Sequence, residues 1–175
     1  MCFRIRRRLF YLSLGAIAFL LAYYVGASTK LSDREAGDLK KQFSDQIQGI
    51  DQYGIFANNV KIALGMFIPA FGAGLGIFSG ISTGMVFSAL AKNSPFLSGV
   101  SPLVIMASPF GAMEVFAYGL AMSRSSMLVY QLVKKRPWQE YALPTAIEVG
   151  IAIAVLLVAA FIEWWLIVHF GGLGQ

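Results

Sequence analysis

The chain has 175 residues, of which 57% are hydrophobic and only 13% are charged, and its formal net charge is +5. A soluble domain carries about a quarter charged residues, so this composition excludes an ordinary water-soluble domain and indicates lipid as the main solvent. The basic residues cluster beside apolar runs, a pattern that orients membrane proteins, so nucleic acid is not an expected partner. The single cysteine, Cys2, excludes an internal disulfide and a cysteine metal cluster.

The first predicted element is a transmembrane helix in the N-terminal segment 1–27. The basic stretch RIRRR precedes an uncharged run over 9–27. About 20 apolar residues are enough to cross a bilayer, and the run is longer than the roughly 7–15 residues of a signal-peptide core. The preceding positive charges predict a cytoplasmic N-terminus.

The segment 28–57 is predicted to form an amphipathic helix outside the membrane. Ser32 and Glu35 have the spacing of a capping box, which marks a helix start. Four apolar residues then repeat along one helical face. They are Leu39, Phe43, Ile47 and Ile50. This face rests on the bilayer or on the protein's own bundle, or else it docks another protein.

The next segment is uncharged between Lys61 and Lys92, which predicts a span over about 60–81 followed by a break or a tilted continuation. Asn58 and Asn59 are predicted to cap its start. Glycine recurs at every fourth residue in this segment. The four positions are Gly72, Gly76, Gly80 and Gly84. Such a stripe favours close helix packing, and a backbone-lined ion path is the alternative.

Three Ser-Pro steps in residues 93–109 predict a broken or re-entrant segment, because proline interrupts helices. Ser108 and Pro109 are predicted to start a helix that runs to about Val133. The basic stretch KKRP that follows is expected in the cytoplasm, and the last helix is predicted from Pro144 to Phe170. The prediction is therefore an all-α integral membrane protein with about five spans and an extracytoplasmic C-terminus.

Four charged residues fall inside the predicted spans: Glu114, Arg124, Glu148 and Glu163. Such residues are costly in lipid and usually pair inside the bundle. Arg124 and Glu148 lie ten residues before and after the turn at 134–138, so both are about 15 Å from it and are predicted to pair. Glu114 lies about 15 Å from Arg124 along one helix, so its partner is expected on another span. The charges could form a structural bridge or a proton or substrate pathway, or they could face a lipid defect or a partner subunit.

Enzymatic residue patterns are absent from the sequence. The one histidine, His169, lies near the end of the last predicted helix, and no nucleophile elbow or phosphate-binding loop is present. We therefore expect no catalytic residue, no cofactor and no metal.

The stretches GIFANNVKIAL, SPFGAME and AAFIEWW resemble the stage II sporulation protein M family over about residues 53–165. The matching motif positions are Asn58, Pro109, Gly111, Glu114 and Glu163. Phe110 stands where the family usually has histidine, which argues against histidine proton chemistry or metal ligation.

The resemblance implies a multi-pass helical protein whose membrane domain spans 58–175. The family's namesake works with cell-wall hydrolases during engulfment in endospore formers, as a membrane anchor and organiser. The function predicted here is a non-enzymatic cell-membrane protein that organises an assembly with a membrane-protein partner or a second copy of itself. The alternative is a small transporter or channel that uses the intramembrane charges.

Overall fold

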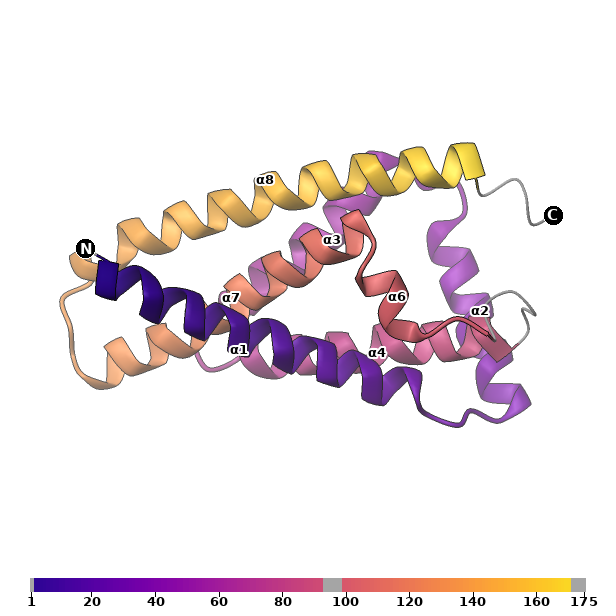
Figure 1. Cartoon of the computed structure of the whole chain (residues 1–175), viewed down its shortest axis with the longest axis horizontal. Coiled ribbons are helices and arrows are strands. Elements are labelled where there is room, and N and C mark those ends of the chain that lie inside the picture. Colours follow the sequence, from indigo (N-terminus) through magenta and orange to yellow (C-terminus); the bar gives the residue numbers. More distant parts are fainter. Residues whose placement is uncertain (1, 93–98, 171–175) are drawn as a thin grey trace.

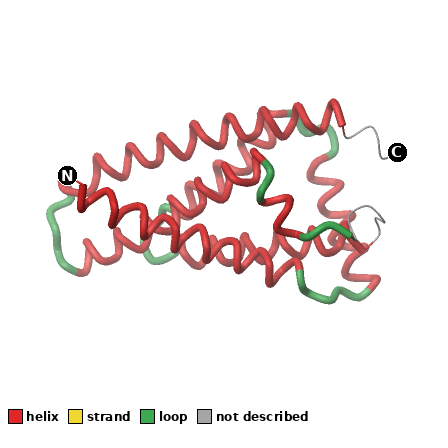
Figure 2. Tube along the Cα trace, in the orientation of Figure 1, coloured by secondary structure: helices red, strands yellow, loops and turns green. Residues whose placement is uncertain are grey.

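The computed structural model describes residues 2–92 and 99–170, in which helices are joined by short loops and turns (Figures 1 and 2). The described residues form seven helices, labelled as in Figure 1. They are α1 (Cys2–Ala27), α2 (Asp33–Ile47), α3 (Gln52–Met66), α4 (Gly72–Lys92), α6 (Pro102–Met106), α7 (Pro109–Val133) and α8 (Gln139–Phe170). The first of the three Ser-Pro steps, at 94–95, lies outside the described residues.

Three segments of the described chain are long and apolar enough to cross a membrane: Arg6–Ala27, Gly72–Lys92 and Gln139–His169. They belong to α1, α4 and α8. The fold is therefore that of an all-helical membrane protein with three candidate spans. Helix α7 carries Glu114 and Arg124 and is not among the three.

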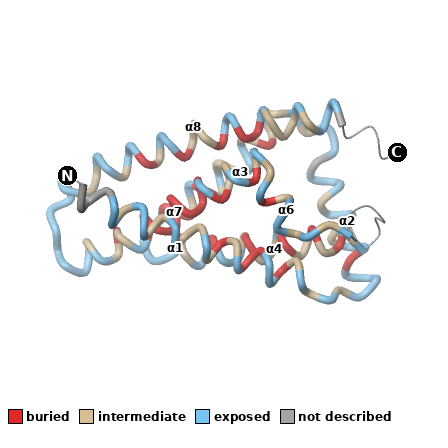
Figure 3. The backbone as a smooth tube through the Cα atoms, in the orientation of Figure 1, coloured by how far each residue is buried: buried red, intermediate tan, exposed pale blue. Residues whose placement is uncertain are grey.

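Helix α7 is the centre of the bundle. It packs against α1, α4, α3 and α8, and α8 lies along α7 and α3 (Figure 1). Residues 117–125 of α7 are buried without interruption, whereas α8 is buried on one side only (Figure 3). A helix surrounded by other helices can carry charged residues, because its neighbours supply their partners.

The predicted continuous span over 60–81 is wrong, because the chain turns at 67–71 between α3 and α4. Pro69 lies in this turn, and proline has no N–H to continue the helical bonding. The turn is fixed by two bonds to the carbonyl of Ile68. Ser125 Oγ donates to it at 2.6 Å, and the N–H of Gly72 donates at 2.8 Å.

Two predicted helix starts are also wrong. The predicted caps Asn58 and Asn59 lie inside α3, which starts earlier because the Asp51 side chain accepts a bond from Gly54 N at 2.8 Å. Helix α8 begins at Gln139, so Pro144 lies inside it. Proline near a helix start removes one backbone bond, and here the next residue, Thr145, donates its hydroxyl to the carbonyl of Tyr141 at 2.6 Å.

Other predicted boundaries are confirmed. Ser32 and Glu35 form both bonds of the capping box that starts α2. Ser108 caps α7 through a bond from Gly111 N at 3.1 Å, and α7 ends at Val133 as predicted. Helix α2 is shorter than predicted, since Gly49 adopts a φ of 72°, a left-handed conformation that commonly follows a helix end.

The predicted close packing of the α4 glycines is confirmed, and all four are buried. A side chain at Gly76 would overlap Met122 of α7, and one at Gly84 would overlap the backbone of α1 at Tyr23. A second close approach joins α1 to α7, where a side chain at Gly15 would lie 2.5 Å from the carbonyl oxygen of Gly119. Small residues therefore bring the backbone of α1 close to those of α4 and α7.

Candidate functional site

Arg8, Arg124 and Glu148 form one ion-pair network that joins α1, α7 and α8. Arg8 Nε and Nη2 donate to Glu148 Oε1 and Oε2, each at 2.6 Å. Arg124 Nε donates to Oε2 at 2.7 Å, and its Nη2 also bonds Oε1. The Glu148 carboxylate therefore accepts two bidentate guanidinium groups, the geometry in which arginine binds carboxylates most strongly.

The network is also bonded to the α7 backbone. Arg8 Nη1 donates to Ser123 Oγ at 2.7 Å, and Arg8 Nη2 donates to the carbonyl of Leu120 at 3.1 Å. The side chain of Arg124 is 5% exposed and that of Arg8 is 18% exposed. Four donated bonds occupy the carboxylate, so Glu148 has no free position at which to take up a proton or an ion. Its chemistry in this arrangement is that of a fixed counter-ion.

The predicted pairing of Arg124 with Glu148 is confirmed, and the sequence analysis missed Arg8 as the third member. From the sequence, Arg8 belongs to the basic flank that predicts the orientation of the first span. The flank is itself helical, because α1 begins at Cys2, and its last arginine therefore faces the bundle. Arg8 directly precedes the apolar run, which was the one available signal for its depth.

A second polar group lies further along α7. Asn59 Nδ2 of α3 donates to Glu114 Oε1 at 2.6 Å. Glu163 of α8 interacts electrostatically with Glu114 and with Tyr118. Among the described residues, no cationic side chain lies within 4 Å of either carboxylate. Glu114 thus has its partner on another helix, as predicted, and that partner is an amide.

The Pro-x-Gly-x-x-Glu motif has a structural explanation at each position. Pro109 is the first residue of α7, where a missing N–H costs nothing. Gly111 lets the end of α6 approach, since an added side chain would lie 2.5 Å from the carbonyl oxygen of Ile105. Glu114 then bonds Asn59, while the predicted motif residue Asn58 is exposed.

Helix α2 is tied to the end of α4. Lys92 Nζ lies 2.7 Å from Asp33 Oδ1 and donates to the carbonyl of Leu31 at 2.8 Å. The hydrogen bond from Lys92 lowers the pKa of Asp33 below its usual value, and bonds from Ser32 lower the pKa of Glu35. Both carboxylates are therefore ionised at neutral pH, at the helix end where negative charge is favoured.

The predicted apolar face of α2 is only partly visible. Leu39, Phe43 and Ile50 are half-buried, and Ile50 lies beyond the end of α2. The side chain of Ile47 is outside the described residues. Helix α2 packs against α4, so this face rests at least in part on the protein itself.

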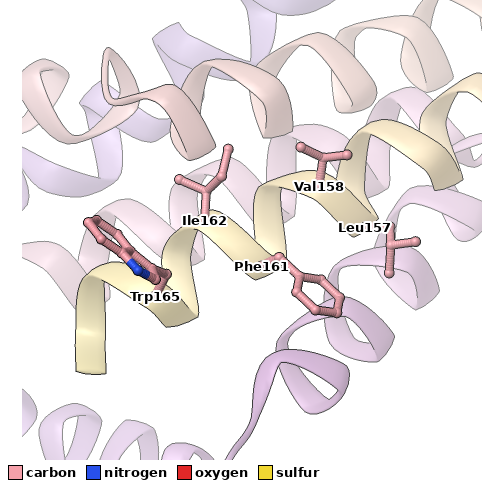
Figure 4. A pocket seen from close by; sticks show the side chains of 5 residues that line it. All are labelled: Leu157, Val158, Phe161, Ile162 and Trp165. Atoms are coloured by element: carbon pink, nitrogen blue, oxygen red, sulfur yellow. The ribbon is translucent and has the colours of Figure 1, made fainter. Parts of the chain in front are cut away.

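Helix α8 has an uncovered outer face. Ala146, Gly150 and Ala154 recur at every fourth residue and are all exposed, and a side chain added at Gly150 would meet nothing within 4 Å. An open apolar groove of about 590 Å³ continues along the same helix (Figure 4). Its lining residues are Leu157, Val158, Phe161, Ile162 and Trp165.

Two observations concern metal-binding side chains and the one histidine. Within residues 2–92 and 99–170, no three His, Cys, Asp or Glu side chains are grouped so as to hold a metal ion. His169 stacks on Trp165 with ring centroids 4.5 Å apart, and its Nδ1 lies 2.8 Å from the carbonyl oxygen of the same residue.

The fold and the two polar groups define an all-helical integral membrane protein with charges held inside its bundle. The model of the stage II sporulation protein M family matches residues 9–166, and the chain belongs to that family. The match begins at residue 9, in α1, whereas the motifs that show the resemblance in the sequence begin at about residue 53. No curated protein and no solved structure matches the chain.

Proposed function

We propose that this protein is a non-enzymatic, multi-pass membrane protein that organises a membrane protein assembly through the outer face of α8. The observation that carries the proposal is the exposed stripe of Ala146, Gly150 and Ala154 on a helix long enough to cross a membrane. Small residues at this spacing let a second transmembrane helix approach closely. The comparable stripe on α4 is already covered by α1 and α7, so the α8 stripe is the one left for a partner.

The occupant we infer is a transmembrane helix of another membrane protein. The groove beside Val158 and Phe161 continues the contact surface beyond the small residues. A partner's transmembrane helix would therefore meet a continuous apolar surface along α8. An organising role of this kind agrees with the role that family resemblance implies. The apolar face of α2, with Leu39 and Phe43, is a second candidate contact outside the membrane.

The ion-pair network supports an organising role over transport. A pathway needs charged groups that can exchange a proton or a solute, whereas Glu148 is bonded by both arginines. Arg8 and Arg124 hold three helices in register through this one carboxylate. A fixed bridge of this kind stabilises the bundle, a role that well-packed apolar side chains in its place could also fill.

The proposed topology has five crossings, made by α1, α3, α4, α7 and α8, with the N-terminus in the cytoplasm and the C-terminus outside. The basic residues at 4–8 and 134–136 support this orientation, because cytoplasmic flanks are enriched in Lys and Arg. Helix α3 takes the place of one predicted span, and α2 lies on the outer side. The proposed parts are the first helix (1–27), the outer segment (28–57) and the family membrane domain (58–175).

A transporter or channel remains the second candidate, and the outer polar group favours it. Glu114 and Glu163 interact inside the bundle, and in the described residues neither has a cation within ion-pair distance. Intramembrane carboxylates of this kind are typical of proton relays. Asn59 of α3 bonds one of them.

Site-specific photo-crosslinking in cells tests the proposal. A photoreactive residue at Ile151, beside the stripe, is expected to crosslink to a defined membrane protein, whereas one at the exposed Phe78 of α4 is not. Gly150→Leu should abolish the Ile151 crosslink, because added bulk separates the helices. Gly74→Leu is the matched control, since Gly74 is equally open but lies on α4.

Three results would change the account. Lipid adducts alone at Ile151, or a protein crosslink that survives Gly150→Leu, would reject this face as the contact. A crosslinked species at twice the mass of the chain would identify a second copy as the occupant.

A further inference from the structure

A basic and aromatic cluster lies where α1 meets the last turns of α7. The Arg7 Cζ is 5.7 Å from the centre of the Tyr11 ring, and the Lys134 Nζ is 6.0 Å from the centre of the Tyr130 ring. Helix α1 packs along α7, and Tyr130 is near enough to act on the charge of Arg7. In the described part of the chain, neither cation has a carboxylate within 4 Å. The cluster therefore presents uncompensated positive charge beside aromatic rings.

An apolar groove of about 310 Å³ begins beside this cluster and runs between α1, α4 and α7. Its lining residues are Tyr11, Leu14, Gly15, Ala18, Ala73, Ile77, Met122, Ser123 and Ser126. Tyr11 belongs to both the groove and the cluster. From Tyr11 to Ala18 the groove extends about 10 Å along α1, in the direction away from Arg7. Ala18 and Ala73 contribute only small side chains to this lining.

We propose that this site binds one anionic phospholipid, with its headgroup phosphate between Arg7 and Lys134 and one acyl chain in the groove. A phospholipid has a charged headgroup at the membrane boundary and apolar chains that extend into the membrane. The site has the same arrangement, with the two cations at one end and the apolar groove leading away from them. Basic pockets between transmembrane helices attract anionic headgroups, and tyrosine is enriched at the depth of the headgroups. The occupant is a single acyl chain and not a protein helix, since a helix with its side chains is about 10 Å wide or more and the groove encloses only about 310 Å³.

Native mass spectrometry of the purified protein in detergent tests the site directly. The protein is titrated with phosphatidylglycerol and, separately, with phosphatidylcholine of the same chain length. The wild type is expected to bind phosphatidylglycerol more tightly. Arg7→Gln combined with Lys134→Gln should weaken phosphatidylglycerol binding by about 30-fold, because each basic side chain near a headgroup contributes roughly a fivefold factor. Phosphatidylcholine binding should change little.

A matched double variant separates local contact from overall charge. Arg6→Gln combined with Lys135→Gln removes the same two charges from neighbouring positions of the same two regions, and it should leave the lipid preference close to that of the wild type. Equal weakening by both double variants would overturn the proposal, and so would equal binding of the two lipids by the wild type.

The groove is tested independently of the charges. Ala73→Leu should fill it and weaken the binding of both lipids, whereas Gly74→Leu, one residue away in open space, should not. Unchanged lipid binding by Ala73→Leu would reject the groove as the acyl-chain site. Circular dichroism of each variant verifies that it is folded, so a loss of binding is read only from a helical protein.

Discussion

Replacing Glu148 with leucine should destabilise the protein more than replacing Arg124 does. Glu148→Leu removes the one anion and leaves two guanidinium groups side by side, one of them only 5% exposed. Stranding a buried charge in this way costs about 3–5 kcal/mol. In Arg124→Leu, by contrast, Glu148 keeps both of its 2.6 Å bonds from Arg8. The expected loss is then that of charge-assisted hydrogen bonds, about 1.5–3 kcal/mol.

Combined replacements test the same reasoning. The double change Arg124→Leu with Glu148→Leu leaves only Arg8, which is 18% exposed and near the start of its span, so it can extend toward the interface. Most of the stability lost in Glu148→Leu should therefore return. Adding Arg8→Leu should return the rest, because a wholly apolar replacement of a buried ion network is often neutral.

The assay is unfolding in mixed detergent micelles by added sodium dodecyl sulfate, followed by circular dichroism. Free energies of unfolding are compared among the wild type, the two single variants and the combined variants. If Arg124→Leu were as damaging as Glu148→Leu, Arg8 would not be an effective partner of the carboxylate. If the combined variants were no more stable than Glu148→Leu, the network would not be a self-contained unit.

Three further predictions concern other parts of the bundle. Gly76→Leu should lower the melting temperature in detergent more than Leu75→Ala does, because the added side chain would overlap the Met122 side chain of α7 and push the two helices apart. Equal tolerance of both changes would reject the tight α4–α7 contact. Ser32→Ala should cost α2 about 1 kcal/mol and raise its amide hydrogen exchange while α7 is unaffected; unchanged exchange in α2 would show that the cap is dispensable. Asn59→Leu should cost about 1–3 kcal/mol in the same detergent unfolding assay by removing the hydrogen bond to Glu114, and no loss would mean that this carboxylate has another donor.

The features that could be predicted from sequence are those set by local or one-dimensional rules. The capping box of α2 and the Ser108 start of α7 depend on residues three apart, so their spacing is sufficient. The pairing of Arg124 with Glu148 followed from helical rise, because both lie on helices joined by a short turn.

The features that were missed depend on contacts between distant segments. Arg8 is 140 residues away from Glu148 in the chain, and no spacing rule connects α1 to α8. The turn at 67–71 could not be predicted from hydropathy, because the residues on both sides of it are apolar. Pro69 did not reveal it either, since a single proline can also kink a continuous helix. The bond from Asn59 to Glu114 depends on the packing of α3 on α7, which sequence spacing does not show. The sequence therefore predicted only a helix cap at this position.

The measurement that tests the central claim most directly is the Ile151 crosslink in a variant that lacks the three charges of the network. This variant carries Arg8→Leu, Arg124→Leu and Glu148→Leu. The account holds that the network has a purely structural role, which packed leucine side chains can also fill, and that the outer face of α8 makes the functional contact. It therefore predicts a folded variant with the same crosslinked partner and the same yield as the wild type. A folded variant that loses the partner would contradict the account, because the charges would then act in function rather than in register.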